Sequence, residues 1–144
     1  MNETTIRKRR ILFLCTHNAA RSQMAEGFIN AMYNEHYTAF SAGSEPTSVH
    51  PCAIRVMEEV GVDISSQHAK SLNEFEGMHF DYVVSLCADA EEHCPVFPRG
   101  EVYLQHAFPN PVSATENDAG ACTPFREARD HIREWLEATF GDGT

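Results

Sequence analysis

The sequence predicts an α/β protein built on a parallel sheet. Apolar runs typical of strands alternate along the chain with helical patterns, and this alternation at short spacing favours a parallel sheet. The 144 residues suffice for a domain with its own core, and no repeat or linker divides them. We therefore expect a single domain over residues 10–141, preceded by a flexible basic tail over residues 1–9.

The first half of the chain contains two predicted strands and two predicted helices. Residues 11–15 form a continuous apolar run of the kind buried on both faces of a sheet, and a second strand is predicted over 37–41. A helix lies between them, and another begins at Pro51 and ends at Gly61. The apolar stripes expected to be buried are Ala20, Met24, Phe28 and Met32 in the first helix, and Ile54, Val56, Met57 and Val60 in the second.

The second half is predicted to contain strands over residues 82–87 and 102–108 and a long final helix. Thr123 is the expected N-cap of that helix, Pro124 fits its first turn and Gly141 ends it. Its expected buried stripe is Phe125, Ala128, Ile132, Trp135 and Leu136.

Composition and charge exclude several classes of protein. A formal net charge of -10 argues against nucleic acid as a partner, because binding a polyanion requires a basic face. No apolar stretch approaches the ~20 residues of a membrane span. The five cysteines, an odd number without an export signal, suggest reduced thiols in a cytoplasmic protein. Any disulfide is then expected to be transient.

The loop after the first strand carries the main candidate site. It has the form Cys, five residues, Arg, Ser from Cys15 to Ser22. In such a loop the backbone N–H groups can converge on a tetrahedral anion, the helix adds its positive N-terminus, and Arg21 presents a planar fork. The same field favours the Cys15 thiolate, to which Ser22 can donate a hydrogen bond. The alternative is a buried cysteine beside an ordinary exposed arginine. The predicted oxyanion-binding residues are Thr16, His17, Asn18, Ala19, Ala20, Arg21 and Ser22, with His17 contributing through its backbone.

Two more thiols, Cys87 and Cys94, follow the third predicted strand. Because ligands of parallel sheets bind at the carboxyl ends of the strands, Cys15 and Cys87 are expected at the same rim. Cys87 is alternatively a buried strand residue. A metal site of Cys87, His93 and Cys94 is disfavoured, since no second cluster completes the coordination. Cys52 and Cys122 fit no part of this arrangement, and we interpret them as having no role.

The segment from Cys15 to Gly27 resembles the phosphate loop of arsenate reductases built on the low-molecular-weight tyrosine phosphatase fold. The resemblance extends from about Arg10 to Phe140. It implies a three-layer sandwich in which a four-stranded parallel sheet carries helices on both faces. Shorter motifs that resemble the same family are Ser41-Ala42-Gly43, Glu45-Pro46, His50-Pro51 and Gly61-Val62-Asp63-Ile64-Ser65.

This resemblance implies reduction of arsenate to arsenite. Cys15 would attack arsenate, Cys87 would attack the adduct, Cys94 would resolve the disulfide, and thioredoxin would donate the electrons. We expect no bound cofactor, no nucleic acid or membrane partner, and a monomer. The alternative is a low-molecular-weight protein tyrosine phosphatase that hydrolyses phosphate monoesters through a cysteinyl-phosphate intermediate. A non-catalytic oxyanion-binding module is the third possibility.

Two positions depart from the pattern of the family. Its general acid is an Asp before a Pro, where this chain has Asn110, and an amide cannot donate a proton to a leaving group. This weakens the phosphatase hypothesis more than the reductase hypothesis. Glu116 and Asp118 are possible substitutes, and the acid remains unassigned.

The second departure concerns potassium. Some members of the family hold this ion with residues equivalent to Asn18, Glu26 and Ser41 and with a carboxylate, at whose position this chain has Lys70. A lysine there can neutralise Glu26. We therefore predict no required metal, and we expect Asn18 to brace the loop.

Overall fold

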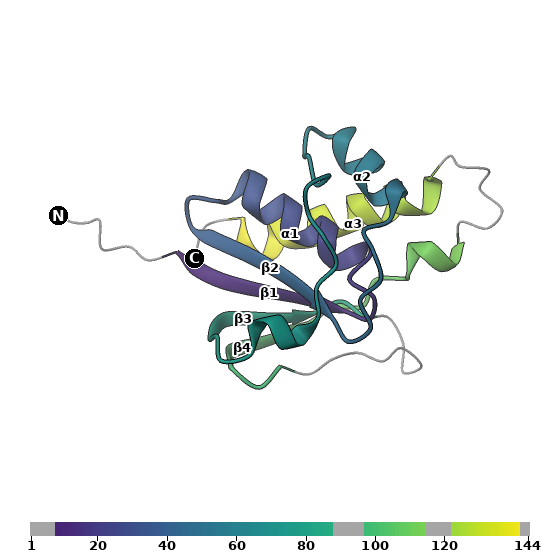
Figure 1. Ribbon diagram of the computed structural model, residues 1–144. Helices are drawn as coiled ribbons and strands as arrows, with labels where there is room; N and C mark the ends of the chain where they lie inside the picture. Colours follow the sequence, from purple (N-terminus) through teal and green to yellow (C-terminus); the bar gives the residue numbers. More distant parts are fainter. Residues whose placement is uncertain (1–7, 88–96, 115–121, 142–144) are drawn as a thin grey trace.

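A four-stranded parallel sheet runs through the centre of the computed structural model, which describes residues 8–87, 97–114 and 122–141 (Figure 1). The strand order is β2-β1-β3-β4, and every neighbouring pair is parallel. All four predicted strands are present, with ends shifted by a few residues. Their bounds are Arg9–Cys15 for β1, Tyr37–Gly43 for β2, Phe80–Ser85 for β3 and Gly100–Gln105 for β4.

Helices cover both faces of the sheet, as predicted. The three α-helices pack on one face and the short 3-10 helix η1 lies against the other (Figure 1). None of the helices in the described ranges is long and apolar enough to cross a membrane. The helices are α1 (Arg21–Met32), α2 (Pro51–Glu58), η1 (Leu72–Phe75), η2 (Pro111–Ala114) and α3 (Thr123–Phe140).

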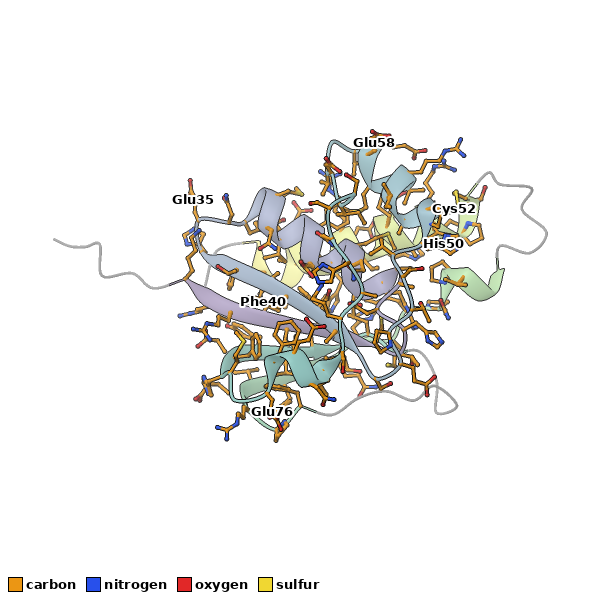
Figure 2. All side chains as sticks on the ribbon, in the orientation of Figure 1. Glu35, Phe40, His50, Cys52, Glu58 and Glu76 are labelled. Carbon is orange, nitrogen blue, oxygen red and sulfur yellow. A yellow bond between two sulfur atoms is a disulfide. The ribbon has the colours of Figure 1, made fainter. Side chains whose placement is uncertain are left out.

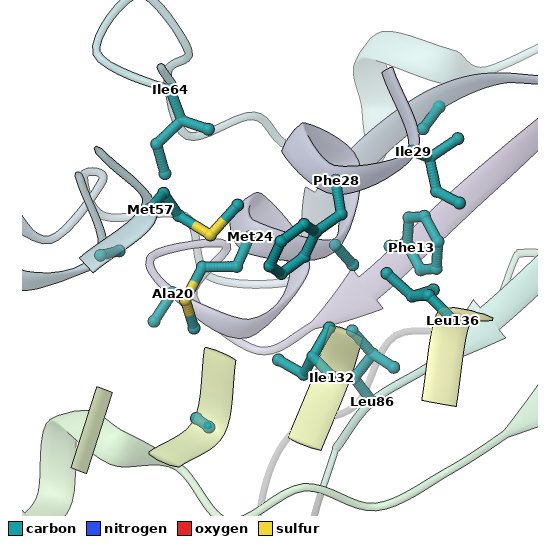
Figure 3. Close-up of a cluster of buried hydrophobic side chains, with 14 of the residues drawn as sticks. Phe13, Ala20, Met24, Phe28, Ile29, Met57, Ile64, Leu86, Ile132 and Leu136 are labelled. Carbon is teal, nitrogen blue, oxygen red and sulfur yellow. The ribbon is translucent and has the colours of Figure 1, made fainter. Parts of the chain in front are cut away.

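The sheet separates two hydrophobic clusters because successive side chains of a strand point to opposite faces. Ile11 and Phe13 of β1 belong to the larger cluster, and Leu12 and Leu14 to the smaller one. Figure 3 shows the larger cluster, to which α1, α2 and α3 contribute side chains such as Phe28, Met57 and Leu136. The smaller cluster includes Phe75, Phe80, Val83 and Phe97.

Several details of the predicted helices are wrong. The N-cap position of α3 is Cys122 rather than Thr123, and Cys122 has a left-handed backbone with φ of 63° and no capping side chain. Met32 is 41% exposed, because α1 ends there and its last turn extends past the core. Trp135, Ile54 and Val60 are only partly buried, at the rim of the larger cluster. Gly61 ends the α2 segment as predicted, with φ of 83°.

An ion-pair network joins the end of α2 to α3. Glu59 accepts hydrogen bonds from Arg126 (2.8 and 2.6 Å) and from Nη1 of Arg129 (2.9 Å). The same Arg129 nitrogen donates to the carbonyl of Val56 at 2.9 Å. The hydrogen bond from Arg126 is the largest cause that lowers the pKa of Glu59 to about 2.

This network predicts an acid-sensitive contribution to stability. The pKa of Glu59 is lower in the folded chain than its ordinary value of 4.5, so the contribution is fully present above that pH and is lost as the pH falls through about 2. We expect Glu59→Gln to unfold at a lower temperature than the wild type at neutral pH. The two unfolding temperatures, measured by circular dichroism, should converge near pH 2. A constant difference across this range would contradict the prediction.

Candidate active site

The carboxyl ends of β1 and β3 bring Cys15 and Cys87 together. Leu86 N donates to Leu14 O at 2.9 Å, which extends the pairing of the two strands by one residue, and each cysteine is the next residue along its strand. The two cysteines therefore lie at the same rim of the sheet, and they are 2% and 4% exposed. Cys15 is a free thiol, whereas Cys87 is disulfide-bonded. Cys94 and His93 lie outside the described residues.

The loop between β1 and α1 has its carbonyl groups turned outward at residues 16–19. Three of them accept from backbone N–H groups of residues 45–50, and one accepts from the side chain of Gln23. Because C=O and the following N–H point in opposite directions in a planar trans peptide, the N–H groups of residues 17–20 face the interior of the loop. That is the geometry of an anion-binding nest. The bonds are Glu45 N to Thr16 O (2.9 Å), Thr47 N to His17 O (3.1 Å), Gln23 Nε2 to Asn18 O (3.0 Å) and His50 N to Ala19 O (2.9 Å).

Arg21 is the first residue of α1 and is fixed across the ends of two strands. Its Nη1 donates to the carbonyls of Leu86 (3.2 Å) and Phe108 (3.0 Å), which follow β3 and β4. It is 2% exposed, which excludes the alternative of an ordinary exposed arginine. No side-chain hydrogen bond caps α1 at Ala20, and the positive end of the helix faces the loop.

Ser22 contacts the sulfur of Cys15. The Ser22 Oγ lies 2.8 Å from Cys15 Sγ and accepts a hydrogen bond from Asn18 Nδ2 at 2.7 Å. Asn18 has a left-handed backbone with φ of 52°, a conformation that asparagine tolerates better than most residues. It braces the loop, in agreement with the expectation. The ring of His17 instead contacts the carbonyl of Glu45 through Nδ1 (3.0 Å), so this side chain is engaged outside the nest.

Gly43, at the end of β2, permits the close approach of the loop. A Cβ atom at this position would lie 2.5 Å from Thr16 O, 2.9 Å from Asn18 N and 3.0 Å from Cys15 O. All three are backbone atoms, which cannot rotate away as a flexible side chain can. The glycine of the Ser41-Ala42-Gly43 motif is therefore required by contact with the loop.

We expect Gly43→Ala to displace the loop and to lower kcat/KM for an oxyanion substrate about 10²-fold, the scale on which a displacement of ~1 Å acts. Steady-state kinetics and calorimetric titration with phosphate measure the effect. Gly100→Ala is the matched control, because its Cβ would meet the side chain of Val83 instead (2.5 Å). That control should lose stability and keep phosphate affinity. Equal kinetics for Gly43→Ala and the wild type would show that the loop tolerates the methyl group.

Lys70 neutralises Glu26, as predicted. Lys70 Nζ lies 3.5 Å from Glu26 Oε1, with side-chain exposures of 11% and 14%, and Ser41 Oγ donates to the same carboxylate. Lys70 N also donates to Asn18 Oδ1 at 2.8 Å, which links this pair to the loop. Within the described ranges no group of three histidine, cysteine or acidic residues is placed to hold a metal ion.

Removal of the ammonium group is expected to create a cation requirement. Lys70→Met leaves Glu26 uncompensated, which should lower the free energy of unfolding by about 2 kcal/mol, less than the ~3–5 kcal/mol of a fully buried pair. Potassium, compared with sodium at equal ionic strength in thermal unfolding and rate measurements, should partly restore the variant and leave the wild type unchanged. The double variant Glu26→Gln/Lys70→Met should regain stability without potassium. A wild type that potassium activates would overturn the prediction.

Asn110 has a structural task next to the site. Its Oδ1 accepts from Val112 N at 3.1 Å and caps η2. It lies two residues beyond Phe108, whose carbonyl binds Arg21, so the position predicted for a general acid adjoins the loop. Glu116 and Asp118 lie outside the described residues.

The interpretation of Cys52 and Cys122 as residues without a role is wrong. They form a disulfide with a Cα–Cα distance of 5.4 Å across a sequence separation of 70 (Figure 2). Cys52 is the second residue of α2 and Cys122 directly precedes α3, so the bond joins the starts of two helices. Nothing in their spacing predicts it.

His50 connects this disulfide to the loop. Its backbone N–H donates to Ala19 O, and its Nδ1 accepts from Cys52 N at 3.0 Å. Its ring stacks on that of Phe125, with 4.6 Å between the ring centroids. Figure 2 shows His50 and Cys52 next to each other at the start of α2. Burial lowers the pKa of His50, which favours the neutral ring that this acceptor role needs.

Comparison with known proteins matches nearly the whole chain. The family model for low molecular weight phosphotyrosine protein phosphatase matches residues 10–139. Arsenate reductase 1 of Staphylococcus epidermidis is 36% identical over 132 residues, covering 92% of this chain and 96% of that protein. An arsenate reductase solved in its phosphate-binding state has a TM-score of 0.78 and 30% identity, covering 94% and 99% of the two chains. A thioredoxin-dependent arsenate reductase of Corynebacterium glutamicum has a TM-score of 0.66 and 26% identity, covering 93% and 63%.

Proposed function

Since the chain belongs to the low molecular weight phosphotyrosine protein phosphatase family and is an arsenate reductase within it, we propose that it reduces arsenate through Cys15, Cys87 and Cys94 with thioredoxin as electron donor. The observation that carries the proposal is the meeting of two cysteines at one rim of the sheet. A phosphatase needs only the nucleophile and the oxyanion loop, whereas a reductase also needs thiols that supply electrons. Cys87 follows the strand next to that of Cys15.

The first step uses the loop and Arg21. The inward N–H groups of residues 17–20, the α1 N-terminus and the Arg21 guanidinium hold arsenate and neutralise its charge. The Cys15 thiolate attacks arsenic, and one As–O bond breaks so that the oxygen leaves as water after taking up protons. The product is a covalent Cys15-arsenic adduct in which arsenic is still pentavalent.

The second step transfers the electrons. The sulfur of Cys87 attacks the sulfur of Cys15, the S–As bond breaks, and its electron pair remains on arsenic, which leaves as arsenite. Cys94 then attacks Cys87, which frees the Cys15 thiolate and moves the disulfide away from the loop. The dithiol of thioredoxin reduces this disulfide by thiol exchange. Each cycle therefore consumes two electrons and releases arsenite and water.

Two observations support the relay. Cys15 is a free thiol while Cys87 is disulfide-bonded, which is the state expected of these two residues after the disulfide has moved away from Cys15 and before thioredoxin acts. A structural relative is a thioredoxin-dependent arsenate reductase. Recharging of this kind requires a compartment that keeps thioredoxin reduced, and we accordingly propose the cytoplasm.

A coupled assay tests the proposal. Purified protein is mixed with thioredoxin, thioredoxin reductase and NADPH, and the loss of NADPH is followed after arsenate is added. We expect arsenate-dependent oxidation by the wild type, none by Cys87→Ser, which stops at the Cys15 adduct, and none beyond a single turnover by Cys94→Ser. The matched control is Cys52→Ser/Cys122→Ser, which removes two cysteines outside the relay and should retain turnover at low temperature. A wild type that does not oxidise NADPH in response to arsenate would refute the proposal.

The phosphatase alternative predicts a different result. Turnover of an aryl phosphate would need Cys15 and Arg21 and would survive the loss of Cys87 and Cys94. The structure disfavours efficient hydrolysis, because the amide of Asn110 caps η2 and carries no proton for a leaving group. Aryl phosphate turnover comparable to arsenate turnover would favour the phosphatase.

A further inference from the structure

We infer that Gln23 is a positioning residue for Cys15, because its side-chain amide holds Asn18 in the orientation that directs the hydroxyl hydrogen of Ser22 at the Cys15 sulfur. The inference rests on the proposed function only in that Cys15 is the nucleophile. It extends the site beyond the loop, to the third residue of α1 and to the segment of residues 67–70.

The amide of Gln23 has a single possible orientation. Gln23 is 0% exposed, and a buried amide of this kind requires hydrogen-bond partners. Its Nε2 lies 3.0 Å from Asn18 O and 2.9 Å from His68 O. Both are backbone carbonyls, which only accept, so the nitrogen of the amide must face them. The same nitrogen lies 2.8 Å from Asn18 Oδ1.

The orientation of Asn18 follows in turn. Its Oδ1 accepts from Gln23 Nε2 and from Lys70 N, each at 2.8 Å. The backbone N–H of Lys70 only donates, so the oxygen of the Asn18 amide lies on that side and Nδ2 on the other. Nδ2 consequently donates to Ser22 Oγ at 2.7 Å.

Ser22 is the last link to the sulfur. Its hydroxyl group has one hydrogen, and its oxygen already accepts from Asn18. The remaining hydrogen is available for Cys15 Sγ at 2.8 Å, and a thiolate there only accepts. The series of side chains from Gln23 to Ser22 therefore directs one hydrogen-bond donor at the Cys15 sulfur, an interaction that a thiolate accepts.

Gln67 holds Gln23 from the opposite side. Its Nε2 donates to the backbone carbonyl of Gln23 (3.1 Å) and to Gln23 Oε1 (2.7 Å). Both ends of the Gln23 amide are thus occupied. Both of these hydrogen bonds go to Gln23 and neither goes to the oxyanion loop. A substitution of Gln67 is therefore expected to affect the hydrogen bond at the Cys15 sulfur through Gln23.

The test measures the thiol itself. The rate at which iodoacetamide alkylates Cys15 is followed against pH and assigned to the Cys15 peptide by mass spectrometry. Gln23→Met removes the amide donor and keeps the length of the side chain. We expect the midpoint of the profile to rise by about one pH unit, the size of one hydrogen bond to a charged group. The charged and titratable neighbours at this rim, Arg21, His17 and Cys87, are unchanged in the variant.

Two comparisons separate positioning from a general loss of structure. Asn30→Leu is the matched control on α1, because the Asn30 amide also binds backbone, donating to Ala39 O (3.1 Å) and accepting from Ala39 N (2.8 Å). It should leave the midpoint unchanged. In a Ser22→Ala background, which removes the donor, Gln23→Met should produce no further shift.

Gln67→Leu is the second variant and applies if Gln23→Met does not fold. It should raise the midpoint in the same direction by a smaller amount, again only when Ser22 is present. An unchanged midpoint in both foldable variants, or a shift that persists undiminished without Ser22, would overturn the inference. Arsenate reduction is not part of this measurement, so failure of the proposed function and failure of the inference are distinguishable.

Discussion

Cys15→Ser is expected to lower arsenate reduction at least about 10³-fold and to leave the fold intact, because a neutral hydroxyl neither attacks arsenic effectively nor forms a disulfide with Cys87. The substitution changes a single atom. Serine can keep the contact with Ser22, and the loop carbonyls stay bound to residues 45–50. We therefore expect phosphate affinity, measured by calorimetry, to change less than threefold while NADPH oxidation in the coupled assay disappears.

Cys87→Ser provides the control for this experiment. It retains the nucleophile, so it should still form the covalent adduct and should be trapped there, detectable as added mass on the Cys15 peptide. Cys15→Ser should show no such mass. Arsenate-dependent turnover that persists in Cys15→Ser would show that another residue is the nucleophile, and the assigned loop would then have no catalytic role.

Breaking the Cys52–Cys122 bond is expected to lower the free energy of unfolding by about 4 kcal/mol. The bond closes a loop with a sequence separation of 70, and in the chain-entropy account a loop of that length restricts the unfolded state by roughly this amount. Chemical denaturation of the wild type with and without dithiothreitol measures the difference. The double variant Cys52→Ser/Cys122→Ser should match the reduced wild type.

The reductant response distinguishes this disulfide from that of Cys87. Dithiothreitol should shift the denaturation midpoint of the wild type and have little effect on the double variant. Any response that remains in the double variant belongs to Cys87. A double variant as stable as the oxidised wild type would show that the Glu59 network and the apolar contacts already hold α2 against α3 without the covalent bond.

The elements that position the site were predictable because their signals are local. The apolar run that ends at Cys15, the polar loop and the amphipathic helix after it follow one another within about twenty residues. Cys87 could be placed at the same rim, since parallel strands present their carboxyl ends together. The pairing of Lys70 with Glu26 could be predicted only from the resemblance to the family, because some members place a carboxylate at the position of Lys70 and hold a cation there.

Other parts of the site depend on tertiary contacts that sequence patterns do not encode. Cys52 and Cys122 are brought together only when α2 and α3 pack on the same face of the sheet. Gln23 looks like an ordinary polar residue of a helix. The orientation of its amide depends on two backbone carbonyl groups, that of His68, which is distant along the chain, and that of Asn18, whose backbone is left-handed. The N-cap position at Cys122 could not be predicted either. Its side chain forms the disulfide with Cys52 and makes no capping hydrogen bond, so the sequence carries no capping signal at this residue.

The outward carbonyls of the loop have a consequence for competition between anions. Their partners in residues 45–50 and Gln23 belong to the protein, so the cavity for the anion is assembled before any ligand arrives, and little ordering entropy opposes binding. Such a preassembled cavity recognises shape and charge, which phosphate and arsenate share. Phosphate should therefore occupy the loop as a reversible competitor at cellular concentrations. Discrimination then occurs only after association, when arsenic accepts an electron pair that phosphorus does not.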